Sequence, residues 1–131
     1  LVVLGPPIRH QTSMLYITAA FIGLVSGLAS GMFGVGGGIV MVPAMVLLLK
    51  VDIKTAVGTS LAVIIPTAVT GALKHHDLGH LNLRMALALV PTAMIGGYIG
   101  SWLTKLIPSQ DLKRAFGVFL ILVGVRLIWF R

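Results

Sequence analysis

Long stretches without charge are the feature that most limits how this chain can fold. No charged side chain and no histidine lies between His10 and Lys50, and Arg84 alone interrupts the stretch from His80 to Lys105. Helical apolar runs of about 20 residues match the hydrocarbon thickness of a bilayer. Only 10% of the residues are charged, whereas a water-soluble domain carries about 25%. We therefore predict an all-α, polytopic integral membrane protein.

The basic residues produce a formal net charge of +7 and lie at the ends of the apolar runs. Lipid head groups and the positive-inside rule place Lys and Arg at such positions. The expected partner of these charges is the lipid bilayer, and nucleic acid is not expected. The chain has no cysteine, which excludes disulfides and thiolate ligands.

The apolar runs predict about four transmembrane helices and one short, broken or re-entrant helix after a glycine-rich break. The expected full spans are residues 14–33, 55–73, 85–104 and 115–130. The short segment, residues 39–49, reaches about 16 Å as a helix, which is half of a bilayer. Residues 1–13 are expected to form a juxtamembrane arm and residues 14–131 a single transmembrane domain. Whether the short segment crosses stays open, and Lys and Arg are too evenly spread to orient the chain.

The sequence GVGGG, residues 34–38, predicts a break between the first span and the short helix. Four glycines within five residues favour unwound backbone with positive φ. At membrane depth such backbone is tolerated only inside protein or beside a water-filled cavity. A helix restarting at about Ile39 would direct free N–H groups and its positive dipole end into that cavity, which suits an anion. The candidate substrate-binding residues are thus Gly34, Gly36, Gly37, Gly38 and Ile39; a tight turn at the membrane surface is the alternative.

The sequence AVGTSL, residues 56–61, is interpreted as a second break. Thr59 and Ser60 are expected either to cap the helix that follows or to line a polar path, and they join the candidate substrate-binding residues. Discontinuous helices that meet near the membrane midplane form the substrate sites of many secondary transporters.

Small residues at four-residue spacing predict close helix packing. Gly23, Gly27 and Gly31 form one stripe on the first span, and Gly96 and Gly100 repeat the spacing in a later one. Such stripes let helix backbones approach each other in lipid.

Three histidines lie in the polar segment between residues 74 and 84: His75, His76 and His80. The four-residue spacing of His76 and His80 is compatible with zinc on a helix, but the chain has only three acidic residues to complete a site. A solvated juxtamembrane loop is the preferred interpretation, and a gating or proton-linked role for His75 is the alternative. We expect no metal, no cofactor and no catalytic residue, and hence not an enzyme.

Four parts of the sequence together resemble the sulfite exporter TauE/SafE family of membrane proteins. They are GLASGMFGVGGGIVMVPAM, AVGTSL, the four-residue steps Gly71, His75 and Gly79, and LKRAFGVFLILVGVRL. The resemblance covers residues 20–127. It implies a multi-pass transporter of the inner cell membrane for sulfite, organosulfonates or other small anions, built from two repeats of this pattern.

Two departures from the family pattern stand out. The family often has Asp three positions after the glycine that matches Gly79, and here this residue is Asn82. The chain also holds a single repeat. We therefore expect one half of a transport unit, either a homodimer or one repeat of a longer chain. A membrane scaffold or accessory subunit without a pathway is the alternative function.

Overall fold

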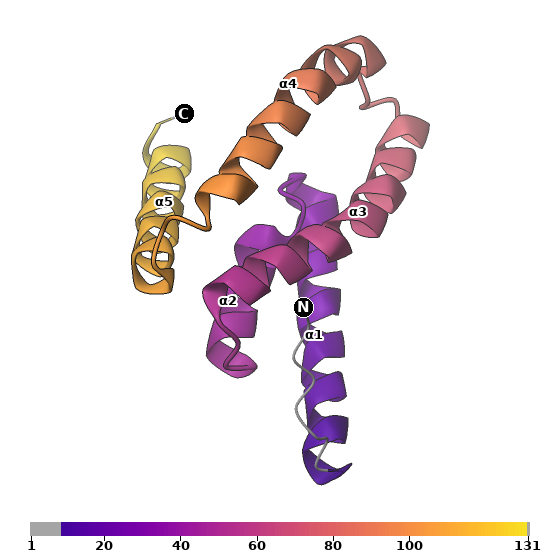
Figure 1. Ribbon diagram of the computed structural model, residues 1–131. Helices are drawn as coiled ribbons and strands as arrows, with labels where there is room; N and C mark the ends of the chain where they lie inside the picture. The colour runs from indigo at the N-terminus through magenta and orange to yellow at the C-terminus, as the bar shows by residue number, and fades with distance from the viewer. Residues whose placement is uncertain (1–8, 131) are drawn as a thin grey trace. The chain divides into compact units, whose positions relative to one another are not determined.

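The structure is a computed structural model that describes residues 9–130, with side chains from Ser13 onward. All regular structure in this part is helical (Figure 1), which confirms the predicted fold class. The helices are α1 (Arg9–Phe33), α2 (Gly38–Leu48), α3 (Ile53–Asp77), α4 (Leu83–Leu103) and α5 (Ser109–Trp129).

Three of the described helices are long and apolar enough to cross a membrane. They are α1 over Ser13–Phe33, α3 and α4. The 11-residue helix α2 is as short as predicted. The predicted fourth span lies in α5, which is helical but carries Arg114 and Arg126. These charges leave only residues 115–125 between them, which is too short a charge-free stretch for a full span.

Two predicted boundaries shift. Residues 1–8 of the predicted arm lie outside the described residues, and α1 already begins at Arg9. The polar segment predicted as a loop from residue 74 is helical as far as Asp77, because α3 continues through it. The non-helical link to α4 is therefore only residues 78–82.

Short polar side chains define the starts of α3 and α4. The Asp52 carboxylate accepts a hydrogen bond from the backbone N–H of Lys54 at 3.0 Å. The Asn82 side chain accepts one from the N–H of Met85 at 3.1 Å. Each bond satisfies an N–H group that has no partner inside the helix. Asp and Asn are equally good at this position, so Asn82 performs the capping that an Asp would perform.

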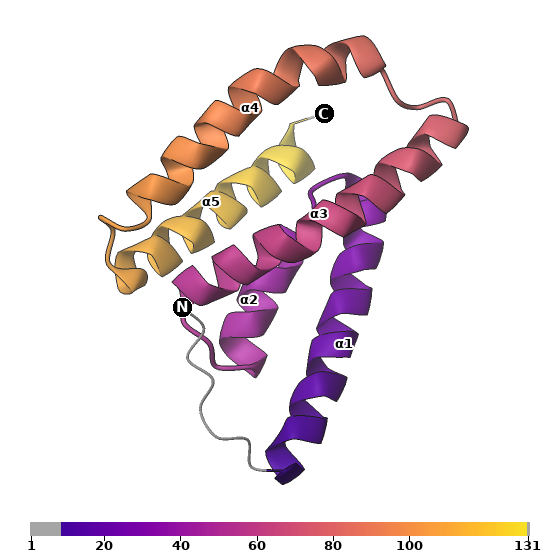
Figure 2. The same ribbon diagram turned by 45° about the vertical axis from the view of Figure 1, so that its right-hand side comes forward.

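The chain divides into two compact units, Leu1–Gly71 and Ala72–Arg131. In the first, α2 folds back alongside α1 (Figures 1 and 2). The apolar core of the described residues lies entirely in this unit and consists of Ile22, Met41, Val42, Met45, Ile53 and Ala56. Helix packing in this unit therefore joins α1, α2 and the start of α3.

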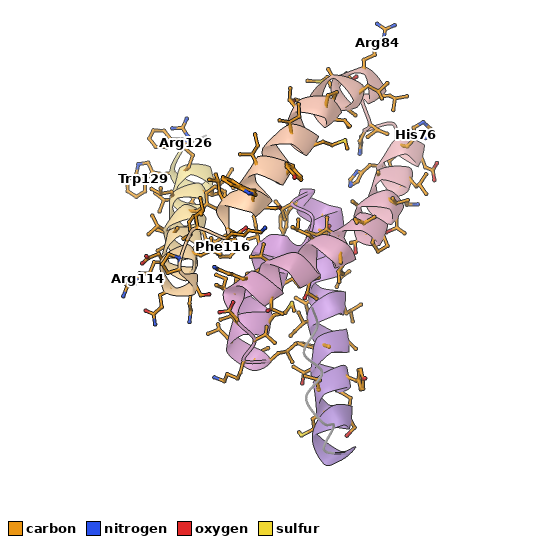
Figure 3. The ribbon with its side chains drawn as sticks, in the orientation of Figure 1. His76, Arg84, Arg114, Phe116, Arg126 and Trp129 are labelled. Carbon is orange, nitrogen blue, oxygen red and sulfur yellow. The ribbon has the colours of Figure 1, made fainter. Side chains whose placement is uncertain are left out.

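The second unit has no buried residue in α4 or α5. Its apolar side chains are largely exposed, including Met94 (70%), Tyr98 (78%) and Ile128 (84%). Figure 3 shows side chains projecting all around these helices. A surface of this kind is stable only against lipid or another protein segment.

Candidate functional site

The glycine break has the backbone that its composition predicts. Gly34, Gly36 and Gly37 have φ values of 68°, 71° and 75°. The N–H of Gly34 still donates to the Ser30 carbonyl at 2.8 Å, closing the last turn of α1. Helix α2 then begins at Gly38, one residue before the predicted restart. The prediction of unwound backbone with positive φ is confirmed.

The first turn of α2 presents backbone donors. Gly37 is its N-cap, in the left-handed conformation, and supplies no side-chain acceptor. Its carbonyl accepts from the N–H groups of Val40 and Met41 at 3.2 and 2.8 Å. The N–H groups of Gly38 and Ile39 precede these and have no acceptor within an α-helix. They lie at the positive end of the helix dipole, the position that favours a negative charge.

Close packing gives a second reason for glycine here. A Cβ on Gly37 would lie 3.0 Å from the carbonyl oxygen of Ser26 and 3.5 Å from Cβ of Ser30. A Cβ on Gly38 would lie 3.3 Å from Ile64 and 3.9 Å from the Ser60 hydroxyl. Side chains at these positions would therefore separate α2 from both α1 and α3.

Three serines provide the buried polar side chains of the described part of the chain: Ser26, Ser30 and Ser60, which are 0%, 7% and 3% exposed. Ser26 and Ser30 come from α1 and Ser60 from α3. The Ser60 hydroxyl donates to the Val57 carbonyl at 2.8 Å, whereas the Ser26 hydroxyl has no hydrogen-bond partner. The Ser60 hydroxyl thus lies near the N-terminal turn of α2, and Ser26 and Ser30 lie on the face of α1 that packs beside Gly37.

The predicted break at AVGTSL is wrong. Helix α3 runs without interruption from Ile53 to Asp77, and Asp52 caps it instead of Thr59 or Ser60. One glycine lowers helix stability by about 1 kcal/mol, which a helix of 25 residues tolerates. Serine and threonine hydroxyls can also bond back to the preceding turn, as Ser60 does.

The two hydroxyl residues predicted in AVGTSL are separated by this helical geometry. Ser60 faces α2, since its hydroxyl lies near Gly38, whereas Thr59 is exposed. Successive helical residues point about 100° apart, so only Ser60 is placed beside the glycine break within this unit. Thr59 stays a predicted substrate residue without a contact to that site.

The glycine stripes do not face the α1–α2 contact. A Cβ on Gly23, Gly27 or Gly31 would have no non-local heavy atom within 4 Å, and the same holds for Gly96 and Gly100. The contact with α2 instead involves the adjacent stripe of α1, which contains Ile22, Ser26 and Ser30. The packing role of the five glycines stays a prediction that requires a further partner.

Ser26 and Ser30 were missed as candidates. Their four-residue spacing runs parallel to the glycine stripe on the same helix. Small residues at this spacing indicate a packing face, and hydroxyl groups on such a face distinguish it from a purely apolar one. That pattern was available in the sequence.

The histidines occupy the end of α3. Gly79 has a φ of 76°; its N–H donates to the His76 carbonyl, and the N–H of His80 donates to the His75 carbonyl at 2.9 Å. These bonds form a Schellman C-cap, which places the rings of His75 and His80 with centroids 6.1 Å apart.

The metal interpretation of these histidines gains no support. The Nδ1 atom of His76 lies 4.0 Å from Oδ1 of Asp77, and both side chains are exposed. His76 points outward in Figure 3, as Arg84 does. Among the described residues, no group of three or more potential ligand side chains could hold a metal ion. His75 stays a candidate for a proton-linked role.

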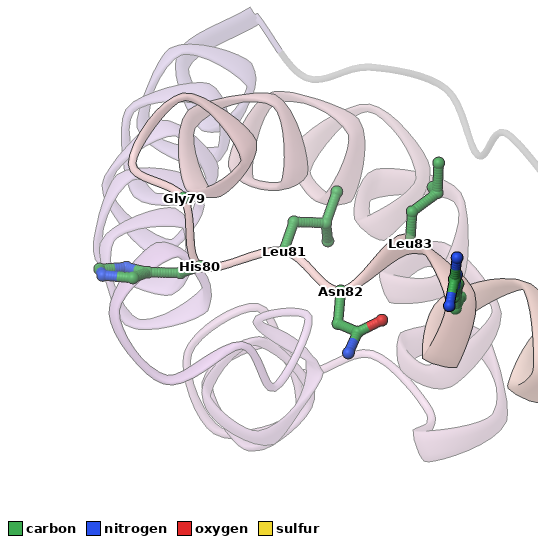
Figure 4. A pocket seen from close by; sticks show the side chains of 6 residues that line it. Gly79, His80, Leu81, Asn82 and Leu83 are labelled. Carbon is green, nitrogen blue, oxygen red and sulfur yellow. The ribbon is translucent and has the colours of Figure 1, made fainter.

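The link between α3 and α4 borders an open surface hollow of about 440 Å³, lined by Gly79, His80, Leu81, Asn82, Leu83 and Arg84. Figure 4 shows Leu81 and Asn82 directed to opposite sides of the chain. The hollow lies at the junction of two helix ends, where Asn82 is engaged as the N-cap of α4.

Comparison with known proteins finds a matching family and several similar membrane proteins. A family model described as Sulfite exporter TauE/SafE matches residues 3–127. The "Probable membrane transporter protein YunE" of Bacillus subtilis (strain 168) is 41% identical over 108 residues, which cover 82% of this chain and 40% of the relative. A "Probable membrane transporter protein" of Xylella fastidiosa is 32% identical over 126 residues, covering 92% of this chain and 48% of the relative.

The chain spans half or less of the length of these relatives. This also holds for the "Probable membrane transporter protein YdhB" of Bacillus subtilis, which is 29% identical over 93% of this chain and 50% of its own length. No solved structure matches the chain.

Proposed function

The chain belongs to the sulfite exporter TauE/SafE family, and from that membership we propose that it forms one half of a transporter for small anions in the inner cell membrane. Sulfite, organosulfonates and related sulfur oxyanions are the proposed substrates. The proposed binding groups are the backbone of the glycine break, Gly34 and Gly36 to Ile39, together with Ser60 and Thr59. Transport of this kind needs no covalent chemistry, so the protein acts as a carrier and not as an enzyme.

One observation carries the proposal: an apolar unit contains a helix N-terminus whose first N–H groups have no intrahelical acceptor. Glycine at positions 36 to 38 keeps side chains away from these donors, and serines border them. The site has donors and a positive dipole end, which together favour an anion.

The distribution of acidic residues supports an anion over a cation. The chain has three acidic residues. Asp52 caps α3, Asp77 ends it and Asp111 lies in the first turn of α5. None lies inside an apolar span, where a cation site would need a carboxylate.

Two observations support the proposal of a second half. The helices of the second unit have no buried residue, and the relatives are about twice as long as the matched region. We propose that a second copy of the chain, or a second repeat of a longer chain, covers these faces and completes the pathway. Cross-linking in native membranes tests the homodimer: a two-copy species supports it, and an exclusively monomeric chain argues against it.

Anion flux into proteoliposomes tests the transport function. We expect saturable flux of sulfite or a small sulfonate, and loss of most of it in Gly36→Ala and Gly37→Ala. Gly117→Ala is the matched control, because its added Cβ meets no heavy atom within 4 Å. Absence of saturable flux with sulfite, sulfate and small sulfonates would refute the function. Full flux in both glycine variants would exclude the glycine break as the binding site.

A further inference from the structure

The hydroxyl of Ser26 is the most unusual polar group in the described part of the chain. The residue is fully buried (0% exposed), and its hydroxyl oxygen has no hydrogen-bond partner. A buried polar group without a partner lowers stability, so such groups are rare and call for an explanation.

Several other hydroxyls in these helices donate to a backbone carbonyl of the preceding turn. Thr18 donates to the Met14 carbonyl, Ser60 to Val57 and Thr67 to Val63, each at 2.8 Å. Such bonds to the preceding turn are the ordinary solution for Ser and Thr in a helix. Ser26 lies on the same helix as Thr18, about two turns further on, and does not use it.

The position of Ser26 links it to the glycine break. Its carbonyl oxygen lies 3.0 Å from the point where a Cβ on Gly37 would stand, so its backbone touches the N-cap residue of α2. Ser30, the next residue along the same stripe, contacts the same glycine. Ser26 thus lies on the face of α1 that packs beside the N-cap of α2, and its unpartnered hydroxyl is buried within the first unit.

We propose that Ser26 is a substrate-binding and specificity-determining residue whose hydroxyl donates to one oxygen of the transported anion. The N–H groups of Gly38 and Ile39 bind the other oxygens. This inference rests on the proposed anion transport and deepens it, because it favours oxyanions with several acceptor oxygens over halides. A hydroxyl donor and backbone donors at different positions match a sulfite or sulfonate group, which offers oxygens in several directions.

The site is closed around Ser26 in this structure, so an anion enters only when α2 moves relative to α1. The glycine break allows such a movement, since hinges are short segments that absorb large changes in φ and ψ. Closure around the substrate then places the Ser26 hydroxyl out of reach of water, where its hydrogen bond to an anion is strongest.

Ser26→Ala tests the proposal, because it separates binding from folding. We expect about a tenfold loss of affinity for sulfite and methanesulfonate, typical of one hydrogen bond to a charged group, with unchanged affinity for chloride. The melting temperature should stay equal or rise, because an unpaired buried hydroxyl is removed. The measurement is the anion-dependent shift of melting temperature for the intact chain in lipid nanodiscs.

Two further variants make the result specific. Ser26→Cys keeps the shape with a weaker donor and should give an intermediate affinity. Thr18→Val on the same helix removes a hydroxyl that is already bonded to its own backbone and should leave affinity unchanged. Oxyanion binding that Ser26→Ala leaves intact would overturn this inference alone. A wild-type protein that binds no oxyanion would overturn it together with the proposed function.

Discussion

The two units of the chain differ in how their helices are stabilised. In the first, α1, α2 and the start of α3 bury an apolar core and three serines around a backbone break. In the second, α4 and α5 are equally regular helices of 21 residues each but bury nothing. The difference shows that helix formation and helix packing are separate requirements in a membrane protein, because backbone hydrogen bonds form within each helix and packing needs a second surface.

The two units also differ in their backbone conformation and buried polar groups. Close approach of backbone, positive φ and a buried unpartnered hydroxyl occur together only in the first unit, among the described residues. Such costly features persist where the surrounding packing stabilises them. The second unit has the composition of a surface that faces lipid or another protein segment.

The largest difference between the units should be in the free energy of unfolding that is lost when an apolar side chain is truncated. Met41→Ala in α2 should lower the free energy of unfolding by about 2 kcal/mol, because Met41 is 5% exposed and its loss leaves a cavity. In micelles that hold the chain as a monomer, Met94→Ala in α4 should have almost no effect, since Met94 is 70% exposed. Equilibrium unfolding in mixed micelles measures both. An equal loss for Met94→Ala would show that a partner buries this face and would remove the contrast.

A somewhat smaller difference is expected between two glycines. Gly37→Ala should destabilise the chain by about 1.5 kcal/mol, because φ of 75° is unfavourable with a Cβ. Gly97→Ala, in the interior of α4 with open space around it, should stabilise by up to about 1 kcal/mol. The same unfolding measurement applies. Destabilisation by Gly97→Ala would indicate a close helix contact at this position.

Helix N-caps should contribute similarly to the free energy of unfolding in the two units. Asp52→Ala at the start of α3 and Asn82→Ala at the start of α4 should each cost about 1 kcal/mol, because each removes a side-chain acceptor for a backbone N–H. Asn82→Asp should stay within a few tenths of wild type. A large effect of Asn82→Asp on flux with unchanged stability would assign this residue a role beyond capping.

The smallest effect concerns the left-handed residues after two helices. Lys50 follows α2 with a φ of 56°, whereas Gly79 follows α3 with a φ of 76°. Lys50→Gly should stabilise the chain by about 0.5 kcal/mol, and Gly79→Lys should destabilise it by a similar or slightly larger amount. Melting temperatures of both variants in detergent test the sign. Destabilisation by Lys50→Gly would show that the lysine side chain contributes a contact that outweighs the backbone strain.

Much of the fold could be predicted from the sequence. The apolar runs predicted the helices and the shortness of α2, and both are confirmed. The clustered glycines predicted positive φ at the GVGGG break, and the motifs predicted the family; both predictions are confirmed. The second break was predicted wrongly from AVGTSL, because a single glycine beside two hydroxyl residues has the same local composition in a break and in a continuous helix. In the structure the helix begins after Asp52, ahead of that motif, and continues through it.

The candidate site was only partly predictable for a related reason. Two neighbouring stripes of small residues lie on α1, one with Gly23 and Gly27 and one with Ser26 and Ser30, and their spacing is identical. The spacing alone does not indicate which of the two stripes packs against α2. The structure places the serine stripe at that contact.

By itself, the sequence determined what short-range physics controls: which segments are helical, which suit a membrane and where glycine releases the backbone. Only the tertiary structure decided which face of α1 packs on the start of α2, because this depends on the path of the chain through Gly34–Gly37. That path places Ser26 beside the N-cap of α2 with a fully buried, unpartnered hydroxyl. Burial is a property of several segments packed together, and it turned an ordinary serine into the residue on which the proposed specificity depends.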